Sequence, residues 1–329
     1  MSPRERVLAT LRGEVADRPP FAVWRHFFGQ EDAGAEALAG TLVAFVRHHA
    51  LDLLKYNSRA HYHAEPWGTR YRYREDERPT LVRCAVERAS DWERIRPVPP
   101  TEGVFAEMLE GLRIARAELP AVPLLMTIFT PLAVCERLGG RERLLADLRA
   151  EPERVQVALE AVTETFGAFA AACLALGAEG IFFATTAWAQ RDTVTDAEYA
   201  RFGRPFDLRV LARAAGAELN VLHVCGAKAR VVELADYPVA AVSWNVHAGG
   251  NPSLAEFRAR VPGRVAIGGV SDAALLSADT GAVRAEVHAA LAQTDGRQWI
   301  AAGGCTIPPD SNTAAIDVAR AALEPAPTR

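Results

Sequence analysis

The stretch Asn220-Val221-Leu222-His223-Val224-Cys225-Gly226 decides the fold that this sequence predicts. Its apolar run favours a buried strand, and the glycine marks the place where that strand ends. Because successive side chains of a strand point to opposite faces, His223 and Cys225 would lie on one face, at the carboxyl end of the strand. The stretch therefore predicts two metal-binding side chains at one edge of a sheet.

A second apolar run, Trp299-Ile300-Ala301-Ala302-Gly303-Gly304-Cys305, also ends in glycines before a cysteine. One histidine and two cysteines supply three zinc ligands, which leaves a fourth tetrahedral position for water or substrate, as in catalytic zinc sites. The alternative is that these residues only fill the core, because free cysteine is among the most often buried residue types. The spacing by itself leaves both interpretations open.

Around these two runs, strand and helix patterns alternate about eight times. This alternation predicts a (βα)8 barrel of the TIM type in a single domain, 1–329, with an irregular segment of loops or a hairpin near 59–100. An open doubly wound sheet is the alternative. The expected strands lie at 21–26, 51–57, 122–129, 180–185, 220–225, 239–246, 264–268 and 299–305. The expected helices include 3–12, 35–49, 105–118, 131–138, 141–149, 152–176, 205–215, 227–236, 281–293 and 312–323.

In such a barrel, the catalytic groups come from the carboxyl ends of the strands. Asn245 is a poor zinc ligand and is expected to orient His223 or the substrate, whereas His247 is either a fourth ligand or a surface histidine. The alternatives for the other candidates are structural ion pairs, solvated arginines and core tryptophans. The candidate catalytic residues are His26, Asp52, Asn57, Asn245 and His247, and the candidate substrate-binding residues are Lys55, Arg59, Trp67, Thr130, Thr185 and Trp188.

Composition and charge exclude several classes of protein. The net charge of −4 over 329 residues comes from interspersed acidic and basic residues, which argues against nucleic-acid or membrane-surface partners. The five cysteines are scattered and odd in number, as in a protein with reduced thiols. We see neither a signal pattern nor an apolar stretch of about 20 residues, so we expect a cytoplasmic protein.

The whole chain resembles the uroporphyrinogen decarboxylase superfamily. The resemblance begins at Arg4-Glu5-Arg6-Val7-Leu8 and Asp17-Arg18-Pro19-Pro20, continues through Leu222-His223-Val224-Cys225-Gly226, and ends at Gly303-Gly304-Cys305-Thr306-Ile307-Pro308-Pro309. It implies a (βα)8 barrel. Decarboxylases of this superfamily use no metal and hold an acidic tetrapyrrole through an early Arg-x-x-Gly-Arg motif and an aspartate. Here the corresponding stretch, Trp24-Arg25-His26-Phe27-Phe28-Gly29, lacks the second arginine.

The other branch of the superfamily resembles this chain more closely. It contains zinc-dependent methyltransferases that move a methyl group from a corrinoid protein to a thiol such as coenzyme M, and the related methionine synthases bind zinc through His-x-Cys and a distant cysteine. The pattern matches His223, Cys225 and Cys305. The resemblance implies Zn²⁺, a small thiol substrate, a methylcorrinoid supplied by a separate protein, and a monomer or homodimer. The alternatives are a cofactor-free decarboxylase of porphyrinogen-like acids and a non-catalytic metal-binding accessory protein.

Overall fold

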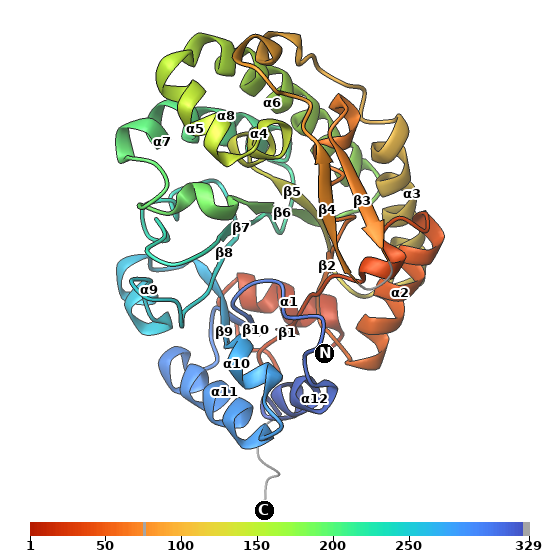
Figure 1. Cartoon of the computed structure of the whole chain (residues 1–329). Coiled ribbons are helices and arrows are strands. Elements are labelled where there is room, and N and C mark those ends of the chain that lie inside the picture. The colour runs from red at the N-terminus through yellow and green to blue at the C-terminus, as the bar shows by residue number, and fades with distance from the viewer. Residues whose placement is uncertain (75–76, 325–329) are drawn as a thin grey trace, which may run out of the picture.

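The computed structural model describes residues 1–74 and 77–324, and its centre is a barrel of parallel strands (Figure 1). Eight strands of the described chain form one sheet in the order β1-β10-β9-β8-β7-β6-β5-β2. Each strand pairs with its neighbour in parallel register, and the two end strands are joined where the Asp52 N–H donates to the Phe21 carbonyl at 2.9 Å. The predicted TIM-type barrel is confirmed. The strands are β1 (Phe21–Ala22), β2 (Leu54–Tyr56), β5 (Leu124–Phe129), β6 (Gly180–Ala184), β7 (Val221–Val224), β8 (Ala241–Trp244), β9 (Val265–Val270) and β10 (Trp299–Gly303).

Helices surround this barrel on its outer face (Figure 1). One hydrophobic cluster fills the space between helices and strands, and a smaller one fills the barrel interior, with Phe182 and Ile300 among its members. Because successive side chains of each strand point to opposite faces of the sheet, the apolar residues of the strands contribute to both clusters. The helices are α1 (Pro3–Leu11), α2 (Ala35–His48), α3 (Gly103–Glu118), α4 (Pro131–Gly139), α5 (Arg141–Ala150), α6 (Pro152–Ala175), α7 (Asp196–Phe202), α8 (Arg204–Arg213), α9 (Leu254–Arg260), α10 (Asp272–Leu276), α11 (Thr280–Thr294) and α12 (Thr313–Ala321).

The amino-terminal helix α1 closes one end of the barrel. Ser2 and Glu5 form a capping box at its start, which satisfies backbone N–H groups that the first helical turn leaves free. Val7 belongs to the barrel-interior cluster, and Arg4 forms ion pairs with Glu179 and Glu218 near the amino ends of β6 and β7. Since α1 covers the amino ends of the strands, the carboxyl ends form the open end of the barrel, called the barrel mouth below.

The irregular segment between β2 and α3 contains a hairpin, as the sequence predicted. Its strands β3 (Arg70–Arg74) and β4 (Glu77–Arg83) pair in antiparallel register. Short 3₁₀ turns flank the hairpin, η2 (Glu65–Trp67) before it and η3 (Ala89–Arg94) after it. In Figure 1 the hairpin lies over β2, on the viewer's side of the barrel.

Two expectations about secondary structure are corrected. The segment 227–236 forms turns rather than a helix, because the Arg230 guanidinium donates to the carbonyls of Ala189, Gln190 and Val194 and ties the segment to the neighbouring loop. Strand β1 is much shorter than the expected 21–26. In the described chain, α6 is long and apolar enough to span a membrane by length and composition, but it packs as a core helix against α4, α5 and α8.

Candidate metal centre at the barrel mouth

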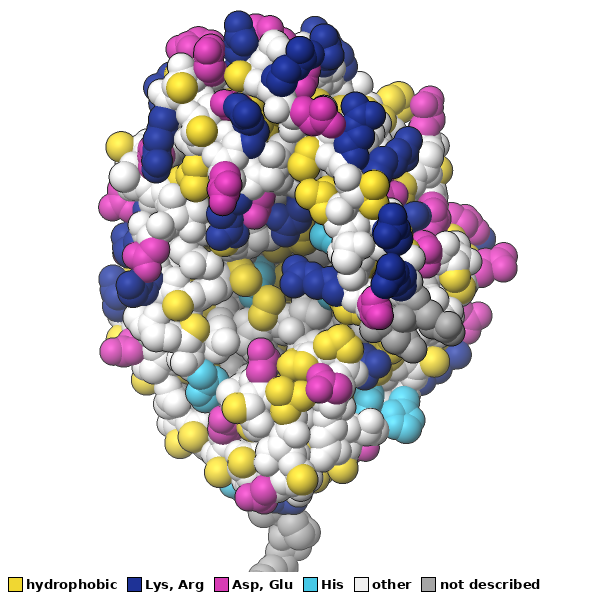
Figure 2. All heavy atoms as spheres, viewed as in Figure 1, with side chains coloured by type: hydrophobic (Ala, Val, Ile, Leu, Met, Phe, Trp, Pro, Cys, Tyr) yellow, Lys and Arg dark blue, Asp and Glu magenta, His cyan; other side chains and the backbone are white. Residues whose placement is uncertain are grey.

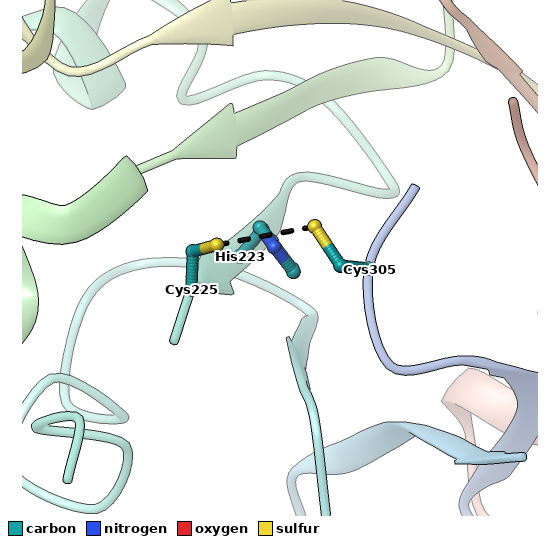
Figure 3. A group of neighbouring side chains, drawn as sticks. All are labelled: His223, Cys225 and Cys305. Carbon is teal, nitrogen blue, oxygen red and sulfur yellow. Dashed lines mark hydrogen bonds between the residues drawn. The ribbon is translucent and has the colours of Figure 1, made fainter. Parts of the chain in front are cut away.

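Three side chains that are distant in sequence converge at the barrel mouth (Figure 3). His223 comes from β7, Cys225 follows that strand directly, and Cys305 lies in the loop after β10. Their ligand atoms all lie within 4.8 Å of one another. The two sulfur atoms are 3.9 Å apart, along the dashed line of Figure 3.

This spacing fits a tetrahedral metal. Two sulfurs bound to one zinc at about 2.3 Å with a tetrahedral angle are separated by about 3.8 Å, close to the 3.9 Å between Cys225 and Cys305. One imidazole and two thiols are also the donor types that zinc prefers. The residues therefore fit a zinc ion and leave one position of the tetrahedron for a further ligand.

The imidazole of His223 is held for such a role. Its Nδ1 lies 3.1 Å from the hydroxyl oxygen of buried Ser243, and its ring stacks on Phe182 with the centroids 5.2 Å apart. Its Nε2 is buried and has no hydrogen-bond partner among residues 1–74 and 77–324. A buried polar atom without a partner is costly, and a bound cation would satisfy it.

Close backbone packing positions the two cysteines. Gly226, which follows Cys225, has φ +90°, and a Cβ there would lie 2.0 Å from the Gln190 side chain. Gly304 precedes Cys305, and a Cβ there would lie 2.6 Å from the Asn245 side chain. Only glycine allows these approaches without displacing the neighbour.

The two thiols are electrostatically unequal. The Cys225 thiol hydrogen-bonds to Cys305, and together with the neighbouring His223 this lowers the pKa of Cys305 well below that of an ordinary thiol. The same hydrogen bond and burial raise the pKa of Cys225. Cys305 is thus the thiol that ionises first, and a thiolate is the form that binds metal.

A buried lysine lies on the same side of the barrel interior. The Lys55 ammonium donates to Asn57 Oδ1 and lies 5.0 Å from the centre of the Phe182 ring, the ring on which His223 stacks. Burial lowers the pKa of Lys55 to about 7, and the negative charge of Cys305 opposes that shift. Lys55 is therefore about half protonated at pH 7, and its positive form interacts favourably with the Cys305 thiolate.

The cluster opens into a cavity of about 630 Å³. Figure 2 shows the hollow near the middle of the face that carries the barrel mouth, with basic, histidine and hydrophobic side chains around it. Arg78 from the hairpin and Arg137 from α4 supply its guanidinium groups, and Phe129 supplies an aromatic wall. The lining residues are His26, Phe28, Ala60, His61, Arg78, Phe129, Arg137, Thr186, Cys225, Cys305, Thr306, Ile307, Pro308 and Pro309.

The arginines make this cavity suited to a negatively charged ligand. The Arg137 guanidinium lies 5.3 Å over the Phe129 ring. Its Nη1 forms an ion pair with Glu136 at 3.1 Å, whereas its buried Nε has no hydrogen-bond partner in the described chain. His61 stacks on Tyr71, and burial together with Arg137 and Arg78 lowers the pKa of His61 to about 3. His61 is therefore neutral at pH 7, and the arginines supply the charge.

Several residues predicted from the sequence lie at this site. His26 lines the cavity, held by the fully buried Glu31 carboxylate at 2.5 Å. Asn57 donates to the Arg25 carbonyl at 3.0 Å and accepts from Lys55. Thr185 receives the Cys225 N–H at 3.5 Å, so it supports the metal-binding loop rather than lining the cavity.

Two further candidates lie beside the cluster. Asn245 packs against Gly304 and accepts the His247 N–H at 3.0 Å, and its role in orienting His223 or the substrate stays a prediction. His247 Nε2 lies 3.2 Å from the Gly269 carbonyl and is outside the group of three ligands. Thr130 is buried at the start of α4, where its N–H donates to the Ala184 carbonyl.

The structure does not support a catalytic or binding role for four candidates. Asp52 precedes β2 and pairs with Arg6 and Arg18 at the opposite end of the barrel. Arg59 pairs with Glu65 and Glu107 at 3.3 Å each. Trp67 and Trp188 are packing residues whose indole N–H groups donate to the Arg96 carbonyl at 2.7 Å and to Glu136 at 2.8 Å.

Sequence reasoning missed part of the cavity wall. His61 and His63 follow β2 with the same two-residue spacing as the metal ligands, and this pattern could have been noticed. His63 is buried and stacks on Phe129 at 3.8 Å. No sequence pattern indicated that Arg78 and Arg137 line the cavity, because their convergence depends on how the hairpin and α4 pack over the barrel mouth.

The sequence of this chain matches a known protein family. The family model described as "Uroporphyrinogen decarboxylase (URO-D)" matches residues 2–324. This chain belongs to the URO-D family. The superfamily that the sequence motifs suggested is thereby confirmed.

Two kinds of relative are similar to this URO-D family member. Proteins named uroporphyrinogen decarboxylase from Xanthomonas axonopodis pv. citri and Xanthomonas euvesicatoria pv. vesicatoria are 33% and 32% identical over 208 residues, and each match spans 59% of this chain and 56% of the relative. A methyltransferase from Methanosarcina mazei has the same fold with a TM-score of 0.82, 20% identity and 98% coverage of both chains. A B12-independent methionine synthase from Shewanella sp. W3-18-1 gives a TM-score of 0.61, 16% identity and coverage of 88% of this chain and 85% of that one.

Proposed function

We propose that this protein is a zinc-dependent methyltransferase that methylates a small, negatively charged thiol. The observation that carries the proposal is the tetrahedral spacing of His223, Cys225 and Cys305 at the barrel mouth, facing a cavity with basic walls. The names of the Methanosarcina and Shewanella neighbours support the same class of reaction. Zinc bound to these three residues would hold the substrate thiol as a nucleophilic thiolate at neutral pH.

The residues around the cluster have distinct parts in this reaction. Ser243 holds the His223 ring, and the protonated form of Lys55 offsets part of the negative charge of Cys305. Arg137 and Arg78 bind the anionic end of the substrate, so its sulfur points toward the cysteines. A sulfur–carbon bond then forms as the methyl carbon leaves its donor, the donor keeps the electron pair of the broken bond, and the thiol proton passes to solvent.

The methyl donor would reach the cysteines over the barrel mouth. Helix α1 covers the amino ends of the strands, and the cavity beside the cysteines lies at their carboxyl ends. We propose a methylcorrinoid presented by a separate protein, for which methylcobalamin is the accessible substitute in an assay.

A second candidate is decarboxylation of a porphyrinogen-like acid. The basic cavity wall suits a carboxylate-bearing substrate, and the Xanthomonas relatives carry the decarboxylase name. This chemistry does not use a metal at the cysteines, so the two candidates differ in their dependence on Cys305. A metal-binding accessory protein, the third candidate, would hold zinc without turning over either substrate.

The decisive experiment measures metal and methyl transfer together. We expect the full chain to contain zinc bound by these residues, and His223→Ala and Cys305→Ser to lose it, while Cys84→Ser, a thiol elsewhere in the fold, keeps it. With methylcobalamin and a panel of thiols, methylated product should form with anionic thiols. A fully active protein without metal, or an active Cys305→Ser variant, would exclude the proposal.

The substrate charge is tested separately at Arg137. Arg137→Gln should raise the KM of an anionic thiol about tenfold or more, since a charge-assisted hydrogen bond is worth roughly 1.5–3 kcal/mol. The KM of a neutral thiol should change little. Arg141→Gln is the matched control, because that exposed arginine of α5 pairs with Glu136 outside the cavity. Equal effects of both substitutions would argue against an anionic substrate.

A further inference from the structure

A second group of metal-ligating side chains lies away from the barrel mouth, between α2 and α12. His48 is the last residue of α2, His49 caps that helix, and Asp317 lies within α12. Their ligand atoms all lie within 4.8 Å of one another, and His49 Nδ1 is 2.7 Å from Asp317 Oδ1. The group thus joins the first helix after β1 to the last helix of the described chain.

The helix end explains how two consecutive histidines meet. Neighbouring residues within an α-helix point about 100° apart, so they do not normally share a ligand. His49 leaves the helical conformation with φ −93° and ψ 6°, and its ring centroid lies 4.6 Å from that of His48 with the planes at 88°. The two imidazoles consequently lie on the same side of the chain, where Asp317 faces them.

The three ligands differ in exposure in a way that suits metal entry. His49 is buried and packs edge-on against Phe45 at 4.8 Å, whereas His48 and Asp317 are exposed. Donor atoms bound to one ion at about 2.0–2.2 Å lie about 3.3 Å apart in tetrahedral geometry. The 2.7 Å between His49 Nδ1 and Asp317 Oδ1 must lengthen to reach this spacing, and the exposed side chains of His48 and Asp317 can adjust by rotating while His49 stays in place.

The electrostatic surroundings also favour a cation. The carboxyl end of α2 carries the negative end of the helix dipole, where cations are stabilised. Asp317 adds a full negative charge, and the nearby basic residue Arg47 is engaged by Glu118 at 2.8 Å. Two imidazoles and a carboxylate without a thiolate suit zinc and its late transition-metal neighbours.

We propose that His48, His49 and Asp317 form a second, peripheral zinc site, completed by water, that ties α12 to α2. This site is independent of the cluster at the barrel mouth and does not rest on the proposed function. Because zinc binding would connect helices from the two ends of the sequence, it should also raise the thermal denaturation midpoint of the chain.

Cobalt titration of the full, tag-free chain separates the two sites. Cobalt bound by cysteines gives an intense sulfur-to-metal charge-transfer absorption, which a site of imidazoles and carboxylate lacks. We expect two equivalents in the full chain and one in His48→Ala and Asp317→Asn, with the charge-transfer band retained in both variants. His288→Ala, which removes an exposed histidine of α11, should still bind two equivalents.

The variant without both cysteines gives the complementary result. Cys225→Ser/Cys305→Ser should bind one equivalent without the charge-transfer band, and adding Asp317→Asn should remove that equivalent at the same cobalt concentrations. A single equivalent in the full chain, unchanged by His48→Ala and Asp317→Asn, would overturn the peripheral site. If the full chain binds one equivalent of cobalt without the charge-transfer band, and Asp317→Asn loses that equivalent, the peripheral site stands and the proposed function fails.

Discussion

Replacement of Asp52 by asparagine should destabilise the fold and leave metal binding intact. The Asp52 carboxylate is 1% exposed. It accepts from Arg6 at 2.6 Å, from Arg18 at 2.6 and 3.1 Å, and from the Phe21 N–H at 2.8 Å. It therefore pairs with two buried guanidinium groups, which also contact Asp17 and Glu324, and it joins the two end strands of the barrel.

The cost follows from what asparagine leaves behind. The amide is nearly isosteric, so no cavity forms, and its oxygen can still accept from the Phe21 N–H. Arg6 keeps Asp17 at 2.7 Å, and Arg18, whose side chain is 4% exposed, loses its buried carboxylate but keeps Glu324 at 3.3 Å. Breaking a buried ion pair by removing one partner costs about 3–5 kcal/mol. We expect the lower figure, about 3 kcal/mol, because each of the two arginines retains a second carboxylate partner.

Urea denaturation of full-length Asp52→Asn measures this loss, with Asp17→Asn as the matched control. Asp17 pairs with the same Arg6 but is 41% exposed, so its loss should cost about 1 kcal/mol or less. Zinc content and thiol methylation of both variants should match the parent protein. A stable Asp52→Asn variant that has lost methylation would refute the structural role and restore the catalytic one.

Three further predictions test other parts of the fold and site. Burial raises the pKa of Asp207 from 3.8 to about 7, so between these pH values the folded state holds a proton that the unfolded state has lost, and the free energy of unfolding falls as pH rises from about 4 to about 7. Asp207→Asn should remove this pH dependence and raise the free energy of unfolding at pH 8 by on the order of 4 kcal/mol. Urea denaturation at a series of pH values measures both effects. Gly226→Ala should weaken zinc binding about tenfold and destabilise the chain by about 1–2 kcal/mol, as measured by zinc titration and urea denaturation. Gly216→Ala is the control, because a Cβ at Gly216 meets open space, and it should change neither quantity. Trp188→Phe should lower the urea midpoint through its lost hydrogen bond and leave the KM for the thiol unchanged; a raised KM would restore its predicted binding role.

The sequence predicted the parts of the structure that depend on local pattern. The alternation of strand and helix was enough to expect the barrel, and the two-residue spacing of His223 and Cys225 placed both near the carboxyl end of one strand. Cys305 could be added because its apolar run also ends at the barrel mouth. Strand direction thus links residues far apart in sequence, since all carboxyl ends of a parallel barrel lie together.

The errors arose where a tertiary contact outweighed the pattern. Asp52 precedes its strand, and polar residues at the two ends of a strand look alike until the partners Arg6 and Arg18 are known. The apolar residues of 227–236 suggested a helix, but the Arg230 guanidinium uses its hydrogen bonds to hold a turn. Arg137 reaches the cavity only through the packing of α4.

The division of the cavity between the two halves of the barrel has a consequence for divergence within the family. The sulfur and imidazole donors come from the later strands, β7 and β10, whereas the hairpin that carries Arg78 is an insertion after β2. Insertions at the surface can be lengthened, shortened or exchanged at little thermodynamic cost. New ligand preferences can therefore arise by remodelling that insertion while the reactive centre and the scaffold beneath it remain untouched.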